Sequence, residues 1–468
     1  MRRLSRVLVL SASAAVLTAC AVGPDYEKPQ AVPPQGAFLG GANAAFTQAA
    51  PAGDWWRLFQ APALDALVAQ ALEANKDIAV ASANLAQVRA SLSEARAGRL
   101  PTTTASSSVR SVRQQIQPGT PPFEADVYNA GFDLNYEVDI FGRVSRNIEA
   151  VRADRDAAQA ALDATRLTVA AETARAFADA CAANVQIEVA NRTLALQQET
   201  LGLTRSQFDN GRGTGLDISR AATQVESTRA TLPPLLAAKD AALFRLAVLT
   251  GQPPAQIPVS ARDCTTIPQV ASAIPVGDGA GLLARRPDVR QAERRLAAAT
   301  ARIGVATAAL YPQVTLGGNI GSTALKAGDL ADDYTFSFGP LISWSFPNIL
   351  ATRARIKQAG AAADGALATF EQANLVALQE TETALSAYAR ELDRRTALRR
   401  GREQSSEALR LARLRYDAGV DSFLTVLDAQ RTLAALEAQL AQSEAAVTTN
   451  QIVLFKALGG GWEVASAE

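Results

Sequence analysis

Four segments of the chain alternate between apolar and polar side chains. In 334–346, nearly every even position is aromatic or aliphatic and most odd positions are Ser, Thr or Gly. Segments 128–138 and 312–322 repeat the pattern, and 102–113 is a weaker, Thr- and Ser-rich fourth. Alternation with period two puts one set of side chains on each face of a strand. The lengths of about 10–13 residues and the aromatic residues near the ends favour oblique membrane strands over a soluble sandwich.

Four strands cannot close a membrane barrel, because single-chain barrels use at least about eight. Open sheet edges are not tolerated in lipid, since their backbone groups have no hydrogen-bond partner there. We therefore expect several copies of the chain to share one barrel around a rotation axis. Two chains would form a plugged eight-stranded barrel, and three would form a twelve-stranded barrel with a lumen. The pattern alone leaves both open.

Two regions without proline, about 142–209 and 349–418, predict helices on the order of 100 Å long. Apolar residues follow at seven-residue steps in two series: Ala180, Ile187, Leu194, Leu201 and Phe208, and Val426, Leu433, Leu440, Val447 and Leu454. This spacing is typical of coiled-coil seams. Apolar residues also spill onto neighbouring positions, which indicates helices that touch partners on two sides, as in the wall of a tube. The pair Pro233-Pro234 is expected to bend or break the helix that follows residue 215.

The main part of the chain contains an internal sequence repeat, which predicts two structurally similar halves. The echoes are Phe208-Asp-Asn-Gly211 with Tyr416-Asp-Ala-Gly419, Leu246 to Gly251 with Phe455 to Gly460, and Leu100-Pro101 with Tyr311-Pro312. We divide the chain into a signal peptide (1–19), a lipidated extended linker (20–53), a first repeat (54–260) and a second repeat (261–468). The first repeat contains strands at about 101–113 and 124–138, and the second contains strands at about 312–322 and 333–346. Long hairpin helices follow the strands in each repeat, and the second repeat ends in a C-terminal equatorial segment.

The start of the chain has the features of a bacterial lipoprotein signal. A basic stretch, Met1–Arg6, precedes an apolar stretch that is too short to span a bilayer. Leu17-Thr18-Ala19-Cys20 then offers a cleavage site before a cysteine, so Cys20 is expected to carry a covalent lipid. Ala21 follows, not the aspartate that in many bacteria retains lipoproteins at the inner membrane, which favours the outer membrane. The alternative is an ordinary secretory peptide with a chance cysteine.

Composition excludes several function classes. The 468 residues contain no histidine, three cysteines, and 46 basic against 46 acidic residues. Catalysis by Ser-His-Asp or Cys-His groups and zinc sites with histidine or four cysteines are therefore excluded. The balanced charge argues against nucleic acid as a partner. We expect neither an enzyme nor a metal site.

Six motifs then occur in a fixed order along the chain. They are Cys20 with Val22-Gly23-Pro24-Asp25-Tyr26; Asp54-Trp55-Trp56-Arg57-Leu58-Phe59; Tyr136-Glu137-Val138-Asp139-Ile140-Phe141-Gly142-Arg143; Arg285-Arg286-Pro287-Asp288-Val289-Arg290; Ile303-Gly304-Val305-Ala306 with Leu310-Tyr311-Pro312; and Tyr416-x-x-Gly419 with Leu427-Asp428-Ala429-Gln430-Arg431. Together they resemble the TolC-type outer membrane factor family, in its NodT-like lipoprotein branch that works with RND efflux pumps.

The resemblance implies an α+β membrane protein that forms a homotrimer. Its twelve-stranded transmembrane β-barrel, with four strands from each chain, would continue into a long periplasmic α-helical barrel. A mixed belt near 54–75, 250–285 and 455–465 would surround the helices. The function implied is a passive exit duct, for which a periplasmic adaptor and an inner-membrane RND transporter supply selection and energy. The lipid on Cys20 would be the sole attached group, with no further cofactor.

The resemblance also implies a periplasmic gate where the long helices turn, at 209–217 and 417–425. Asp421 occupies the loop position of the family's constricting carboxylates, and Asp217 is its counterpart in the first repeat. Candidate latch residues are Arg205, Arg212, Arg413 and Tyr416. A ring of carboxylates attracts cations and disfavours anions.

Both aspartates have a second interpretation as helix caps. Asp421 could cap the helix that starts near Ser422, and Thr214-x-x-Asp217 has the pattern of a capping box. Capping and gating are compatible roles, and the sequence leaves both open.

Cys181 and Cys264 are either two buried small apolar residues or a disulfide that ties the long helix to the belt. We favour the disulfide because an exported chain meets an oxidising compartment.

Two rival functions remain. The same architecture serves exit ducts of protein secretion systems, although the lipoprotein start favours efflux. A structural coiled-coil lipoprotein without a pore is the other rival, and it leaves the aromatic alternating strands unexplained.

Overall fold

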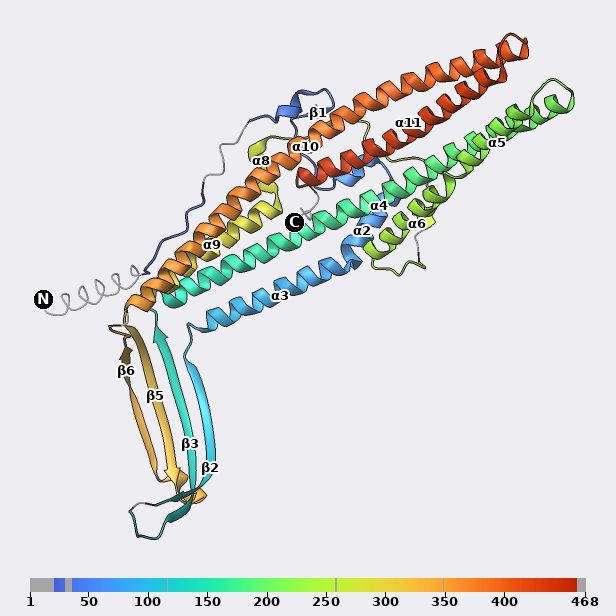
Figure 1. The fold of residues 1–468 in the computed structure, drawn as a ribbon. Coiled ribbons are helices and arrows are strands. Elements are labelled where there is room, and N and C mark those ends of the chain that lie inside the picture. Colours follow the sequence, from blue (N-terminus) through green and yellow to red (C-terminus); the bar gives the residue numbers. More distant parts are fainter. Residues whose placement is uncertain (1–20, 30–35, 116, 257–258, 348, 461–468) are drawn as a thin grey trace. The chain divides into compact units, whose positions relative to one another are not determined.

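The computed structural model describes residues 21–29, 36–115, 117–256, 259–347 and 349–460, so the signal at 1–19 and Cys20 lie outside the described residues. Figure 1 shows the elements. The helices are α2 (Pro62–Ala74), α3 (Lys76–Ala97), α4 (Arg143–Asp209), α5 (Gly215–Arg229), α6 (Leu232–Leu249), α7 (Val259–Arg262), α8 (Gly279–Arg285), α9 (Pro287–Ala308), α10 (Ile349–Asp417) and α11 (Phe423–Ala457). The strands are β1 (Phe46–Thr47), β2 (Thr102–Gln114), β3 (Phe123–Val138), β4 (Ile274–Pro275), β5 (Gln313–Ala324) and β6 (Tyr334–Ser343). Short 3₁₀ helices are η1 (Leu39–Ala42), η2 (Trp55–Phe59) and η3 (Ala327–Ala331).

The chain folds into two compact units, and each unit draws on both halves of the sequence. Unit 1 comprises Met1–Gln30, Asn84–Gln159 and Gln291–Glu371, and unit 2 comprises Ala31–Ala83, Ala160–Arg290 and Gln372–Glu468. Four of the five divisions fall inside helices, namely α3, α4, α9 and α10. The two repeats are therefore interleaved in each unit and do not form separate bodies.

Unit 1 contains a four-stranded antiparallel sheet in the order β2-β3-β5-β6. These are the four alternating segments of the sequence. β6 ends at Ser343, before Trp344 and Phe346, so the strand is shorter than the alternation indicates. Pro347, which lacks a backbone N–H, follows directly. The outer edges of β2 and β6 have no strand partner within the described chain.

The two long regions without proline form single helices. α4 has 67 residues and α10 has 69, each on the order of 100 Å at about 1.5 Å per residue. The predicted break near Pro233 is present, since α5 ends at Arg229 and α6 begins at Leu232 with proline in its first turn. Ala180, Leu201, Val447 and Leu454 of the two heptad series are buried. Every helix in the described ranges is too short or too polar to be a membrane span.

The turns at the helix ends reveal the internal repeat in the backbone. Gly211 and Gly419, each the second residue after its helix (α4 or α10), have φ of 72° and 71°. Gly251 and Gly459 likewise share φ of 73° and 71°, and their separation in sequence equals that of the first pair. A left-handed conformation favours glycine. The echo of Gly251 is thus Gly459, one residue before the Gly460 indicated by the sequence comparison.

The main apolar core lies in unit 2. Trp55 is fully buried and stacks on Phe455, with the ring centroids 5.1 Å apart. Phe59 packs edge-on against both rings. Leu64 of α2, Leu246 of α6 and Leu282 of α8 belong to the same cluster. This core joins the segments that the sequence assigns to the belt.

The N-terminal segment is not a free linker. In unit 1, Ala21–Lys28, here called the strap, lies between α4 and α9. The buried guanidinium of Arg146 donates to the Asp25 carboxylate at 2.6 Å, and the Tyr26 hydroxyl donates to buried Glu293 at 3.0 Å. In unit 2, Phe38 and Phe46 are buried, and β1 pairs with β4.

Candidate functional site

The sheet of unit 1 has one apolar and one polar face. The register places Ala105, Phe132, Ile320 and Phe336 side by side in one row. The next row, which points to the opposite face, is Thr104, Asp133, Asn319 and Ser337. Residues paired across strands share a face. The large side chains of the apolar face are exposed: Phe336 and Phe338 keep 76% and 75% of their surface.

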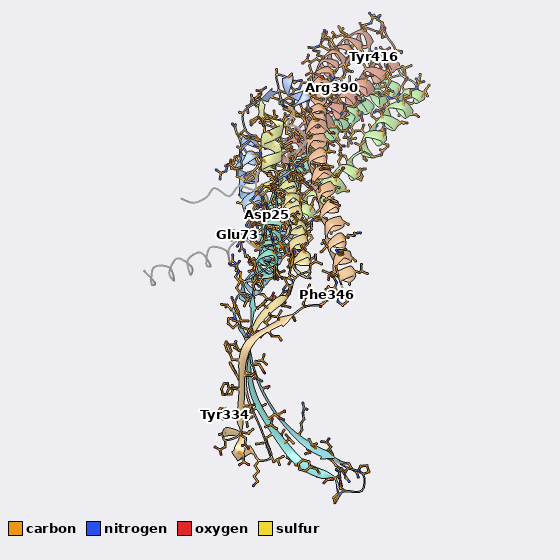
Figure 2. The ribbon with its side chains drawn as sticks, turned by 90° about the vertical axis from the view of Figure 1, so that its left-hand side faces the viewer. Asp25, Glu73, Tyr334, Phe346, Arg390 and Tyr416 are labelled. Carbon is orange, nitrogen blue, oxygen red and sulfur yellow. A yellow bond between two sulfur atoms is a disulfide. The ribbon has the colours of Figure 1, made fainter. Side chains whose placement is uncertain are left out.

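Aromatic and charged residues bound the apolar face at its two ends. Figure 2 marks Tyr334 and Phe346, which lie at opposite ends of the β6 segment. Beyond Tyr128, toward the loop, the same face carries the Arg113–Glu124 ion pair at 3.1 Å. An exposed apolar band between aromatic residues, with charges beyond it, is the pattern of a surface that faces lipid.

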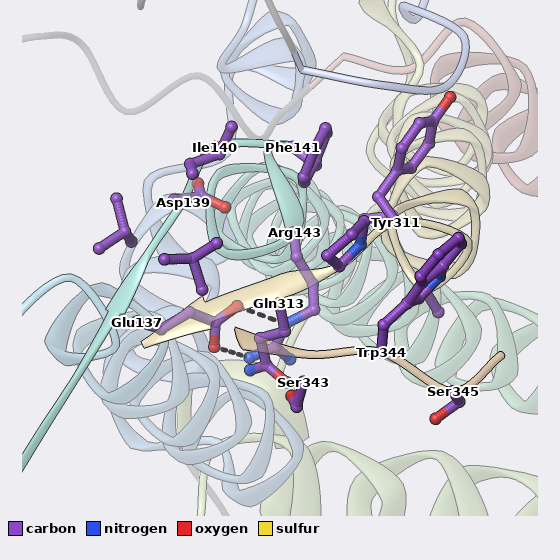
Figure 3. A pocket seen from close by; sticks show the side chains of 15 residues that line it. Glu137, Asp139, Ile140, Phe141, Arg143, Tyr311, Gln313, Ser343, Trp344 and Ser345 are labelled. Carbon is purple, nitrogen blue, oxygen red and sulfur yellow. Dashed lines mark hydrogen bonds and ion pairs between the residues drawn. The ribbon is translucent and has the colours of Figure 1, made fainter. Parts of the chain in front are cut away.

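A pocket of about 280 Å³ lies where the strands of unit 1 meet the helices (Figure 3). In its wall, Arg143 at the start of α4 makes a two-pronged ion pair with Glu137 at the end of β3. Phe141 stacks on Tyr311 with the centroids 4.6 Å apart. The indole N–H of Trp344 donates to the backbone oxygen of Leu310 at 3.1 Å. These contacts join the β3–α4 junction to the α9–β5 junction and to the residues that follow β6.

The turn between α10 and α11 carries the candidate gate carboxylate. Arg415 in the last turn of α10 binds both oxygens of Asp421, at 2.7 and 3.1 Å. The Arg415 guanidinium lowers the pKa of Asp421 below its ordinary value, chiefly through this hydrogen bond. The capping interpretation of Asp421 is wrong, because Ser422 occupies the N-cap position of α11 and the Asp421 carboxylate is held by Arg415. A two-pronged, charge-assisted pair outweighs a single cap hydrogen bond.

The turn between α4 and α5 contains the capping box that the sequence indicates. Thr214 accepts from the Asp217 backbone N–H, and the Asp217 carboxylate accepts from the Thr214 backbone N–H. The Thr214 hydroxyl also donates to Asp217 at 2.6 Å. The Asp217 carboxylate therefore caps the N-terminus of α5, the helix to which Asp217 belongs.

The two helical hairpins are joined close to their turns. The Tyr416 hydroxyl donates to the Gln207 side-chain oxygen, and Gln430 of α11 donates to the Thr200 hydroxyl of α4 at 2.8 Å. Burial is the main cause of a raised Tyr416 pKa. An apolar cluster around Leu201 lies beside these bonds.

The remaining latch candidates do not take part in these contacts between the hairpins. Arg205, Arg212 and Arg413 are exposed and make no ion pair with any residue that the structure describes. Sequence reasoning missed Arg415 and Gln207, the residues that hold Asp421 and Tyr416. The signal for Arg415 was its place in the last turn before Gly419, close enough to reach back over the turn.

Cys181 and Cys264 are joined by a disulfide in the structure, with the Cα atoms 5.3 Å apart. Cys181 is fully buried in the core of unit 2. The bond connects α4 to the segment that follows α7.

Comparisons with known proteins agree on one family. The family model described as outer membrane efflux protein matches residues 67–252 and 281–460. The chain is 31% identical to Nodulation protein T of Rhizobium leguminosarum bv. trifolii, covering 96% of each chain. It is 31% identical to the probable efflux pump outer membrane protein TtgC of Pseudomonas putida, covering 97% of this chain and 96% of that one. Its fold matches the outer-membrane channel OprN with a TM-score of 0.89 and 36% identity, over 95% of this chain and 100% of that one. It matches the open state of the Neisseria gonorrhoeae MtrE channel with a TM-score of 0.80 and 28% identity, over 95% and 99%.

Proposed function

This chain belongs to the outer membrane efflux protein family, and from that membership we propose how its residues build an efflux duct. It is an outer-membrane channel that serves as the exit duct of a tripartite efflux system. Proteins of this family work together with an adaptor and an inner-membrane pump. We further propose how the chains assemble, how they are anchored, where the gate lies and what the duct carries.

The assembly is a homotrimer with a shared barrel. The open edges of β2 and β6 and the two-faced sheet support it, because an open edge is not stable in lipid. When β6 of one copy pairs with β2 of the next, three copies close twelve strands around a lumen. The polar row that includes Asp133 and Asn319 then lines the lumen, and the row of Phe132 and Ile320 faces lipid. This division of faces is the observation that carries the proposal.

The anchor is a lipid on Cys20, and the helical barrel lies in the periplasm. The position of the strap supports this arrangement. Ala21 lies against Gly142, where a Cβ atom would come within 2.8 Å of the Ala21 Cα. Gly142 follows the end of β3, so Ala21, the first described residue of the strap, lies at the level where the sheet ends. We propose that the lipid inserts into the inner leaflet beside the barrel.

The gate is formed by the α10–α11 turns of three chains, where Asp421 and Arg415 alternate around the opening. Tyr416 and Gln207 hold the two hairpins of a chain together in the closed state. Asp421 gives the opening its preference for cations, and Arg415 holds that carboxylate in place. The partners are a periplasmic adaptor and an inner-membrane RND transporter, which supply selection and energy. The duct itself performs no chemistry and needs no cofactor beyond its lipid.

The cargo consists of small organic molecules. The names of relatives mention toluene and antibiotic efflux and pyoverdine export, all of which concern small molecules. A gene deletion tests this assignment: the mutant should accumulate small hydrophobic dyes and regain low levels on complementation. Loss of a secreted protein with unchanged dye accumulation would instead identify a protein secretion duct.

A further inference from the structure

Contacts at two levels join α4 to the second helical hairpin of unit 2, and a hollow lies between the levels. Near the turns, Tyr416 and Gln430 bond to Gln207 and Thr200 of α4. Farther from the turns, residues 262–270, here called the brace, connect α4 to α10 and α11. Between the two levels, a pocket of about 400 Å³ lies among α4, α5, the start of α6 and α11, and its lining is mostly alanine, hydroxyl and amide side chains.

The brace is attached to α4 by a covalent bond and by hydrogen bonds. Cys264 is bonded to the fully buried Cys181. One helical turn along α4, the amide nitrogen of Asn184 donates to the backbone oxygens of Arg262 at 3.0 Å and Cys264 at 2.9 Å. The start of the brace therefore cannot leave α4 while the disulfide is intact.

The other end of the brace is clasped by α10 and α11. The Gln451 amide oxygen accepts from the Val270 backbone N–H at 3.1 Å, and its nitrogen donates to the Val270 oxygen at 2.9 Å and to the Tyr388 hydroxyl at 3.0 Å. Thr448 donates to the Pro268 backbone oxygen at 2.9 Å. Gln451 is 1% exposed, so its amide has no access to water when these bonds break. The clasp is therefore costly to open.

We propose that the brace is a fixed joint between α4 and the second hairpin, so that gate opening separates the hairpins only between the brace and the turns. The hollow supports this division, because the helices there can move without disrupting a close-packed interior. The part of the proposal that concerns gate opening rests on the proposed function. The joint itself can be tested without a pore.

Hydrogen–deuterium exchange of the purified full chain in lipid nanodiscs tests the joint from both of its ends. Gln451→Leu removes the three hydrogen bonds that Gln451 contributes to the clasp, and the double variant C181A/C264A removes the covalent attachment. Glu444→Gln is the matched control, because its side chain lies on α11 and pairs with Arg399. Oxidised wild-type protein treated with a phosphine after folding provides the same comparison without any mutation.

Gln451→Leu should raise exchange in 265–270 and in 444–455 by about tenfold or more, since it leaves the buried N–H and C=O of Val270 without partners. Phosphine reduction should raise exchange in 259–270 and along α4 around Cys181. Glu444→Gln should leave both regions unchanged. Equal exchange before and after reduction, with both thiols shown to be free, would overturn the joint, as would a Gln451→Leu protein with wild-type exchange.

Bilayer recordings of the same preparations separate the joint from the duct. If the joint controls opening, reduction should increase spontaneous openings at least about threefold, because local opening at the brace becomes easier. Unchanged gating together with raised exchange would refute the role in opening. A wild-type protein that forms no pore would refute the proposed function, while the exchange result would still decide on the joint.

Discussion

An arginine on the apolar face of β6 should prevent stable insertion, whereas an arginine on the next residue should not. Tyr334 and Trp344 lie ten residues apart in the sequence. Ten residues span about 33 Å at about 3.3 Å per residue, and a tilt of about 40° reduces this to about 25 Å. That is the typical height of the apolar band of outer-membrane barrels. Phe338 lies near the middle of this band.

The cost of the change follows from the position of Phe338. Its side chain is 75% exposed in the single chain and packs over Gly318, so its replacement creates no core cavity. An arginine near the bilayer midplane of an outer-membrane barrel costs about 2–4 kcal/mol. Three copies in a trimer would lose about 6–12 kcal/mol.

Ser337→Arg is the matched control, because it adds the same side chain one residue earlier on the polar face. It removes a Ser337 hydroxyl hydrogen bond to Asn319 at 2.6 Å, which is worth about 1 kcal/mol when exposed. We expect a lumenal arginine to be tolerated within that amount.

Urea titration of the protein folded into vesicles of fixed thickness measures both changes. Phe338→Arg should lower the unfolding midpoint strongly or abolish insertion, and Ser337→Arg should stay close to wild type. Equal losses for the two variants, or a greater loss for Ser337→Arg, would refute the assignment of the faces.

Three further outcomes follow from individual contacts. Arg415 lowers the pKa of Asp421, so their ion pair is fully formed above the ordinary aspartate pKa and is lost only as the pH falls through the lowered value. Conductance should therefore be constant from pH 7 to about pH 4 and change below about pH 4. A transition between pH 5 and 7 in bilayer recordings would contradict this. Arg146→Leu should release the strap and expose it to limited proteolysis, and wild-type cleavage kinetics would exclude that role for Arg146. Removal of the Cys181–Cys264 disulfide, which closes a separation of 83 residues, should lower stability by up to about 4–5 kcal/mol on the chain-entropy model, measured by denaturation with and without reductant.

The elements that the sequence predicts well are those with a strong period. The alternation around Phe336 and the proline-free stretch that forms α10 are both patterns of neighbouring residues. A single sequence is therefore enough to predict the strand and the helix. The Thr214 capping box is also local, with its partner three residues away. Such features are determined by the spacing of neighbouring residues.

Contacts that depend on how the chain folds back on itself could not be predicted from the spacing of neighbouring residues. The Pro- and Gly-rich strap has the composition of a linker, but Arg146 and Glu293, which hold it, lie far along the chain on two helices. The partner of Asp421 depends on how the turn folds back, and this brings Arg415 to the carboxylate and leaves Arg413 exposed. The interleaving of the two repeats in both units likewise arises from packing, which no local pattern encodes.

Single-channel recording of the purified protein in a planar bilayer tests most directly whether the chain forms a duct. We expect discrete conductance steps with a preference for cations. Asp421→Asn should retain the pore but show a weaker preference for cations. Urea resistance in vesicles shows whether the protein is folded and inserted. Tyr416→Phe loosens the contact between the hairpins and should favour the open state. If the wild-type protein and this variant are both inserted but neither conducts at any voltage, the identification of the chain as a duct is contradicted.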